Sequence, residues 1–312
     1  MKTYKIRPLP LSIIELDMSV FTYRFNTTPT NSVYGAMQDG YVERFDQKIS
    51  PRPSFPKRGI TISPFGPLRQ RLRGEQRGNK GDFVNCRSSI NYGKKIRVPI
   101  TAWFIEGADQ NILVDTAADA KLATEFRGFP AEEVASFEQA LSKLRLKPGD
   151  IDLVIQTHLQ WDHCANTRKC KNAKVVVQQE ELRSAFSPHL ILAPTYKRAL
   201  FRDLKFSIVK GCCEIAPGIE VIPTPGHTPG CQSVSVHTEK GKAVITGFCC
   251  LNANFEPPKD AHEEVKEVTP VIAPGIHLSA VDAFESALLV KGLADIIIPQ
   301  HEPSFLKVKS IP

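Results

Sequence analysis

The sequence predicts an α/β protein in which two mixed β-sheets are flanked by helices. Short apolar runs of strand length alternate with stretches in which apolar residues recur at helical spacing. Several of the strand-like runs follow one another directly, with few helices between them, which is typical of a two-sheet arrangement. The length of 312 residues suffices for one large domain of this class.

The expected helices and strands lie between about residues 112 and 298. The apolar run at 112–114 predicts a buried strand. Apolar residues recur at helical spacing over 134–144, and the Pro-Gly pair at 148–149 ends that helix. The other expected elements are helices at about 179–185 and 283–291, and strands at 151–155, 175–177, 219–222, 233–236, 243–245 and 295–298.

Positive charge is concentrated in one segment. Between Arg44 and Arg97 there are fourteen Lys or Arg and three acidic residues, whereas the whole chain has a net charge of +7. Five prolines and six glycines interrupt this segment, and no nucleic-acid-binding motif accompanies it, so nucleic acid is not the expected partner. An anionic substrate or an acidic partner subunit fits better. We expect one domain over 1–312 with an irregular basic insertion at about 26–95, which either covers the site or forms a homodimer contact.

No membrane span, secretion signal or disulfide framework is expected. No apolar run approaches the ~18 residues that a membrane span needs. Pro8, Pro10, Glu15 and Asp17 interrupt the apolar core of any signal peptide. The eight cysteines include two adjacent pairs and no Cys-x-x-Cys pair, which favours reduced and mostly buried thiols. These features together predict a cytoplasmic protein.

The strongest local signal lies at 157–164, directly after an apolar strand. Here His158, Gln160, Asp162 and His163 stand within six residues. Two histidines and an aspartate at this spacing form a metal-ligand cluster by composition. The alternative for this segment alone is a pair of surface histidines, with Asp162 as a helix cap.

Three further residues extend this candidate cluster. His227 stands in a proline-stiffened loop at 223–230, and His301 follows the last expected strand. Asp115 ends the strand at 112–114, where its carboxylate can orient a ligand histidine through the ring nitrogen that does not bind metal. Because these side chains all stand just beyond strand ends, we expect them to converge on one rim of the sheets.

The order of these motifs resembles the metallo-β-lactamase superfamily. The phrases Thr-His-Leu-x-Trp-Asp-His-Cys, Pro-Gly-His-Thr-Pro-Gly-x-Gln-Ser-Val and Asn-Phe-Glu at 254–256 are most similar to its N-acyl-homoserine-lactonase branch. The resemblance runs from about Val98 to the C-terminus, and it makes 1–26 a candidate first strand. It implies an αβ/βα sandwich with a metal site at the mouth between the sheets.

The resemblance also implies the roles of the ligands, and here the chain departs from the family. The family pattern His-x-His-x-Asp-His, with the Gly-His-Thr-Pro-Gly histidine, a late histidine and a bridging Asp, holds two metals. In this sequence the second histidine of the pattern is Gln160 and the bridging Asp is Phe248. The tyrosine that lactonases place three residues further on is Leu251.

Counting ligands predicts one well-held metal. Asp162, His163 and His301 supply two histidines and a carboxylate, which is a complete catalytic zinc set and also matches the facial set of non-haem iron. His158 and His227 keep only the weak amide oxygen of Gln160 as a third ligand, so the second metal is expected to be weak or absent. A thiolate from Cys249 or Cys250 is an alternative charge donor, but alternation along a continuing strand turns Cys249 away from the site.

The predicted function is a metal-dependent hydrolase that opens a lactone or a related ester or cyclic amide with a metal-bound hydroxide. Asp162 and Gln160 are the candidate catalytic residues, and Gln160 would donate a hydrogen bond to the oxyanion. Phe248 would exclude water from the site and favour an aromatic or apolar substrate. Hydrolytic dehalogenation of an aromatic compound is therefore one alternative function. A non-catalytic binding protein with a degenerate metal site and an iron oxygenase are the others.

Overall fold

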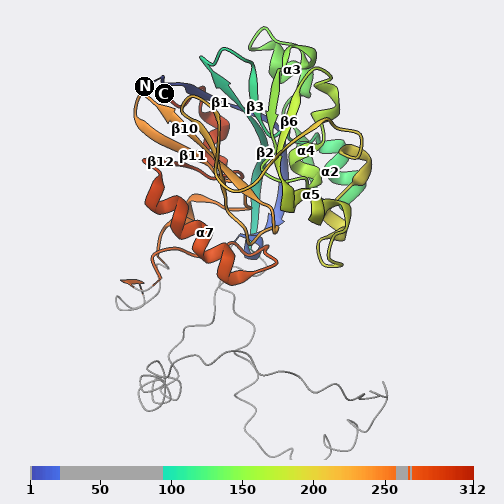
Figure 1. Ribbon diagram of the computed structural model, residues 1–312. Coiled ribbons are helices and arrows are strands. Elements are labelled where there is room, and N and C mark those ends of the chain that lie inside the picture. Colours follow the sequence, from blue (N-terminus) through green and yellow to red (C-terminus); the bar gives the residue numbers. More distant parts are fainter. Residues whose placement is uncertain (1, 22–93, 258–265, 268) are drawn as a thin grey trace, which may run out of the picture. The chain divides into compact units, whose positions relative to one another are not determined.

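The computed structural model describes residues 2–21, 94–257, 266–267 and 269–312 (Figure 1). The basic insertion predicted at about 26–95 lies almost wholly outside the described residues. The described strands form a seven-stranded sheet, in the order β4-β1-β2-β3-β5-β6-β7, and a five-stranded sheet, in the order β12-β11-β10-β9-β8. No helix among the described residues is long and apolar enough to cross a membrane.

The larger sheet combines an antiparallel part and a parallel part. Its two longest strands, β1 and β2, pair antiparallel along nearly their whole lengths, whereas β3, β5, β6 and β7 pair parallel to one another. Parallel strands direct their carboxyl ends to the same edge, which is where the candidate ligands follow. The strands are β1 Lys5–Asp17, β2 Lys95–Glu106, β3 Ile112–Val114, β4 Ala131–Glu133, β5 Leu153–Ile155, β6 Lys174–Gln178 and β7 Phe206–Val209.

The smaller sheet is an antiparallel meander that ends in one parallel pair. β8 to β11 pair antiparallel in chain order, and β12 then pairs parallel to β11 after the chain has passed through helix α7. Its strands are β8 Cys213–Ala216, β9 Ile219–Pro223, β10 Gln232–Thr238, β11 Gly241–Ile245 and β12 Ile296–Ile298.

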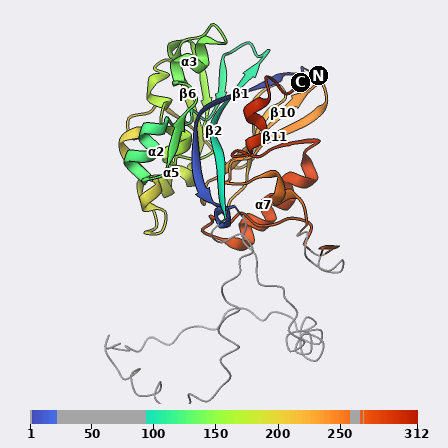
Figure 2. The ribbon, with the colours of Figure 1, turned by 180° about the vertical axis from the view of Figure 1, so that it is seen from behind.

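Helices cover the outer faces of both sheets, as Figures 1 and 2 show from opposite sides. Side chains of β1 and β2 pack against α2 and α3, and Val244 of β11 packs with Ala287 and Val290 of α7. A third apolar cluster, with Trp103 and Val234 among its members, fills the space between the sheets. The predicted α/β class is therefore confirmed. The helices are α2 Ala120–Arg127, α3 Phe137–Ser142, α4 Trp161–Cys164, α5 Gln179–Phe186 and α7 Ala280–Leu293.

Two local differences from the expected elements have clear causes. The helix expected at 134–144 begins only at Phe137, because Ser136 and Gln139 form a capping box there, and it ends at Ser142. Strand β2 was not predicted at all. From Val98 onward its side chains alternate between the helix-facing cluster and the cluster between the sheets, so both faces are buried there and no polar alternation marks that stretch.

Candidate metal centre

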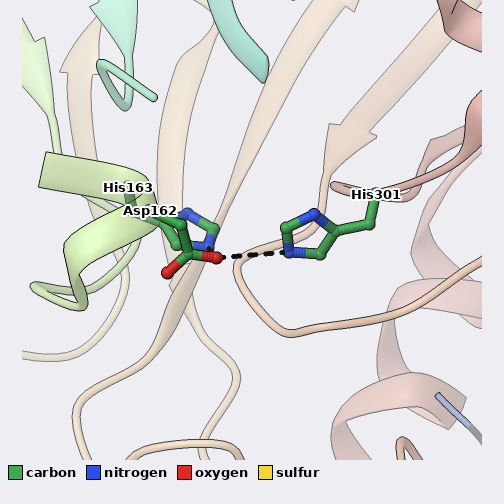
Figure 3. A group of neighbouring side chains, drawn as sticks. All are labelled: Asp162, His163 and His301. Atoms are coloured by element: carbon green, nitrogen blue, oxygen red, sulfur yellow. Dashed lines mark ion pairs between the residues drawn. The ribbon is translucent and has the colours of Figure 1, made fainter. Parts of the chain in front are cut away.

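The predicted ligands come together where strands from both sheets end. Asp162 and His163 lie on α4, shortly after β5, and His301 lies on the loop after β12 (Figure 3). An Asp162 carboxylate oxygen, Oδ2, lies 3.5 Å from Nε2 of His163 and 3.8 Å from Nε2 of His301. One donor atom from each residue therefore lies within 4.8 Å of the others, a spacing that suits a single metal ion.

His158 and His227 lie next to these three residues. The ring centroid of His158 lies 3.9 Å from that of His163 and 4.8 Å from that of His227. His163 and His301 have ring centroids 5.7 Å apart. The structure thus brings all four predicted histidines and Asp162 into one buried group.

Hydrogen bonds donated by the Nδ1 atoms to carboxylate or carbonyl oxygens orient three of these rings. Nδ1 of His163 lies 2.7 Å from Asp115 Oδ2, that of His227 lies 2.8 Å from the Ile276 carbonyl, and that of His301 lies 3.0 Å from the Pro99 carbonyl. A neutral imidazole that donates from Nδ1 keeps its lone pair on Nε2. Each of the three rings is therefore set to offer Nε2 to a metal.

The Asp115 carboxylate, which orients the His163 ring, is itself held by hydrogen bonds. Its two carboxylate oxygens accept from the backbone N–H and the hydroxyl of Thr157, each at 2.8 Å, and from Nε2 of Gln300 at 3.2 Å. Asp115 itself has a φ of +56°, a left-handed conformation that costs energy in a residue other than glycine. The sequence predicted the role of Asp115, but not those of Thr157 and Gln300, whose only signal is that each adjoins a predicted ligand.

The electrostatics divide the histidines into two classes. Burial alone would lower the pKa of His163, but the Asp162 and Asp115 carboxylates outweigh it and raise that pKa well above the usual value. Burial alone would raise the pKa of Asp162, but His163 and His301 outweigh it and lower that pKa. Burial and neighbouring histidines lower the pKa of His158, and burial is the main reason that the pKa of His227 falls to about 4.

Two buried nitrogen atoms at the centre lack a hydrogen-bond partner. They are Nε2 of His158, which is fully buried, and Nε2 of Gln160, whose residue is 5% exposed. An unpaired buried polar atom costs free energy unless a ligand satisfies it. The Nε2 lone pair of His158 and the oriented rings around it fit a metal ion, and the Gln160 amide fits an oxygen of a bound molecule.

The positions of Phe248 and Cys249 correct two expectations. Strand β11 ends at Ile245, so the alternation that turned Cys249 away from the site does not apply. Gly247 passes so close to β10 that an added Cβ would lie 1.9 Å from the Gln232 carbonyl oxygen. After this close approach, Phe248 packs into the core under α7 and Cys249 lines the pocket beside the ligands. Phe248 therefore offers no surface to an aromatic substrate.

Glu181 is a buried residue that the sequence analysis missed. Its carboxylate accepts from the Leu159 backbone N–H at 2.9 Å, from the Tyr196 hydroxyl at 2.9 Å and from the Thr228 hydroxyl at 2.5 Å. Leu159 adjoins His158, and Thr228 adjoins His227. Glu181 on α5 therefore ties together the two loops that carry these histidines.

A pocket of about 440 Å³ opens beside the centre. This volume falls in the range of small-molecule sites. The pocket is lined by Ile14, Glu15, Leu16, Asp17, Val20, Lys95, Arg127, Phe129, Pro130, Gln160, Trp161, Asp162, His163, Thr195, His227, Cys249, Ile276 and His301.

Comparison with known proteins identifies the family of the chain. A model of the metallo-beta-lactamase superfamily matches residues 96–301. The chain belongs to this superfamily. The match extends from β2 to His301, so it includes every predicted ligand.

Curated relatives of this metallo-β-lactamase superfamily member are N-acyl homoserine lactonases. The lactonase of Bacillus cereus is 29% identical over 53% of this chain and 68% of its own length. The lactonase AttM of Rhizobium radiobacter is 25% identical over 70% of this chain and 88% of its own length. These relatives and the superfamily support the prediction of a metal-dependent hydrolase of lactonase-like type.

Solved structures share the fold of this superfamily member. An N-acyl homoserine lactone hydrolase, with the product N-hexanoyl-L-homoserine bound at its catalytic metal centre, matches with a TM-score of 0.61 and 19% identity. The match covers 98% of this chain and 96% of that one. The predicted two-sheet sandwich of the superfamily is confirmed by this likeness.

Proposed function

We propose that this protein is a metal-dependent hydrolase that opens a lactone or a related ester or cyclic amide. The observation that carries the proposal is the position of the Asp162 carboxylate between Nε2 of His163 and Nε2 of His301. Two oriented imidazoles and one carboxylate, with room for a water molecule, are the ligand set of catalytic zinc sites. The lactonase relatives favour a lactone or a closely related acyl compound as the substrate.

The proposed ligands of the well-held metal are Asp162, His163 and His301. His158 and His227 would hold a second metal only with help from the neutral Gln160 side chain, so we propose that this second site is weak or empty. Zinc is the proposed metal, and iron is the alternative that the same ligand set accepts.

The residues of the chain then have separate roles in hydrolysis. A zinc ion in such a site supplies an activated water as nucleophile and polarises the carbonyl under attack. Asp162, with its lowered pKa, stays ionised at neutral pH and orients that water through its carboxylate. Gln160 donates from its unpartnered Nε2 to the carbonyl oxygen, where negative charge develops as the tetrahedral state forms. Burial of the surrounding histidines excludes competing water.

Metal content and lactone hydrolysis test the proposal together. Protein purified without added metal should hold about one zinc per chain by elemental mass spectrometry. His301→Ala should lose the metal and the activity, whereas His189→Ala, an exposed histidine that does not line the pocket, should keep both. Two metals per chain would mean that Gln160 or a cysteine binds the second metal. Iron would favour an oxygenase, and no metal even after reconstitution would overturn the proposal.

A further inference from the structure

The pocket beside the metal centre has a second polar site at the end of α2. Arg127 is the last residue of this helix, and its side chain lines the same pocket as Asp162, His301 and Gln160. Apolar side chains of the pocket, Phe129 among them, accompany it.

The guanidinium of Arg127 is held in place but has most of its hydrogen-bonding capacity unused. Its Nη1 donates to the Pro194 carbonyl at 2.7 Å, and its central carbon lies 5.5 Å from the centroid of the Phe129 ring. Its Nε is buried and has no acceptor. A guanidinium carries a permanent positive charge and five N–H donors, so this one retains charge and donors for a ligand.

No carboxylate of the described residues pairs with Arg127. Arg7 and Arg97, by contrast, each form an ion pair with a glutamate on another strand of the larger sheet. Glu15 and Asp17 also line the pocket, but neither forms an ion pair with Arg127, and Asp17 accepts from the backbone N–H and the hydroxyl of Ser19 instead. Within the described part of the chain, the charge of Arg127 is therefore not paired with a carboxylate.

The pocket thus offers unsatisfied donors in two places. Gln160 lies two residues before Asp162 in the sequence, is 5% exposed and has an unpartnered Nε2. Arg127 has an unpartnered Nε. Leaving both donors without acceptors costs free energy. A ligand with one oxygen at Gln160 and an anionic oxygen at Arg127 would satisfy both.

We propose that Arg127 binds a carboxylate of the substrate, so that the preferred substrate is a lactone or ester with a negative charge away from the bond that breaks. This inference rests on the proposed function, because Gln160 and the metal ligands define where that bond lies. Arginine suits a carboxylate because its planar donors match both oxygens.

Matched substrates test this specificity. The pair is a five-membered lactone bearing a free carboxylate and the same lactone with that group as a neutral carboxamide. The wild-type enzyme should favour the carboxylate by about tenfold or more in kcat/KM, the discrimination that one charge-assisted contact gives. Arg127→Gln, which keeps a donor for the Pro194 carbonyl, should bring the ratio close to one, chiefly through KM. Arg127→Lys should give an intermediate ratio, and Arg183→Gln, an exposed arginine on α5, should leave it unchanged.

Equal use of both lactones by the wild type, or an unchanged ratio in Arg127→Gln, would overturn the assignment. Thermal unfolding of each variant shows whether it is folded. Binding separates this inference from the proposed function, and the probe is the cyclic ether that carries the same carboxylate and cannot be hydrolysed. Calorimetry should show about tenfold weaker binding to Arg127→Gln than to the wild type, even if neither lactone is hydrolysed. Equal binding of the cyclic ether to the wild type and to Arg127→Gln would contradict the role of Arg127, but not the proposed hydrolase function.

Discussion

Nδ1 of His163 lies 2.7 Å from a carboxylate oxygen of Asp115, and both side chains are almost completely buried. The Asp115 carboxylate is held in turn by Thr157 and Gln300. A metal-binding histidine is oriented by the acceptor on its other nitrogen, so the position of the His163 ring depends on Asp115.

Replacing Asp115 with asparagine should therefore weaken metal binding while the ligands themselves are retained. The asparagine amide oxygen is a weaker acceptor for the His163 Nδ1–H. The asparagine amide nitrogen would also lie among the groups of Thr157 and Gln300 that donate to Asp115. We expect a loss of about tenfold to a hundredfold in metal affinity, measured by competition with a chelator. Asp109→Asn is the matched control, because Asp109 is exposed and pairs with Lys2 at the surface. Equal affinity in Asp115→Asn and the wild type would contradict the role of Asp115.

Metal binding should become tighter as pH rises. The pKa of His163 is raised by Asp162 and Asp115, so in the metal-free protein this ring remains protonated at neutral pH. A histidine must be neutral to bind a metal, whereas the lowered pKa values of His158 and His227 keep those rings neutral already. Binding should thus release about one proton near pH 7, and affinity should rise up to about tenfold per pH unit. Calorimetry in buffers of different ionisation enthalpy measures the released proton, and a flat pH profile would count against it.

Glu181→Gln should destabilise the protein. All three groups now donate to the Glu181 carboxylate, so glutamine would replace a charged acceptor by a neutral one, and its amide nitrogen would force the Thr228 hydroxyl to turn and accept. We expect a loss of about 1–3 kcal/mol in the free energy of unfolding, measured by urea denaturation. Glu180→Gln is the control on the same helix, since Glu180 is exposed and pairs with Arg183. A loss of the same size in both variants would show that the three contacts are not the cause.

Two glycine substitutions should change stability in opposite directions. Gly247→Ala would place a methyl group 1.9 Å from the Gln232 carbonyl oxygen, so the loop that carries Cys249 must move. We expect this variant to lose at least about 2 kcal/mol of stability. Gly292→Ala, on α7, meets no atom within 4 Å and should gain up to about 1 kcal/mol from the higher helix propensity of alanine. Thermal unfolding of the pair measures both changes, and a stable Gly247→Ala would show that this loop is free to shift.

Local pattern was sufficient for much of the fold. The strands at 112–114, 219–222 and 243–245 were predicted because short apolar runs with sharp polar boundaries identify buried strands. Strand β2 was not predicted because most of it is buried on both faces, which removes the alternation of polar and apolar residues that marks a half-buried strand. The position of Cys249 was wrong because the prediction assumed that β11 continues, and where a strand ends depends on its pairing with neighbours rather than on its own residues.

The candidate site was likewise predicted in part. His158, Asp162, His163, His227 and His301 were identified because each follows a strand and matches a metal-ligand residue type. Glu181 and Arg127 were not identified. Their significance lies in contacts with distant segments, at Thr228 and Pro194 respectively, and no local spacing in the sequence encodes those contacts.

The proposed ligands of the metal centre are divided between the two sheets of the sandwich. Asp162 and His163 belong to the segment after β5 in the larger sheet, whereas His227 and His301 follow β9 and β12 in the smaller one. An ion bound by Asp162, His163 and His301 would act as a cross-link, because separating the sheets would require breaking its coordination bonds. Occupancy and resistance to unfolding are then coupled, since a ligand that binds only the folded state stabilises it. Chelation would leave a sandwich whose halves part more readily and which proteases cleave sooner.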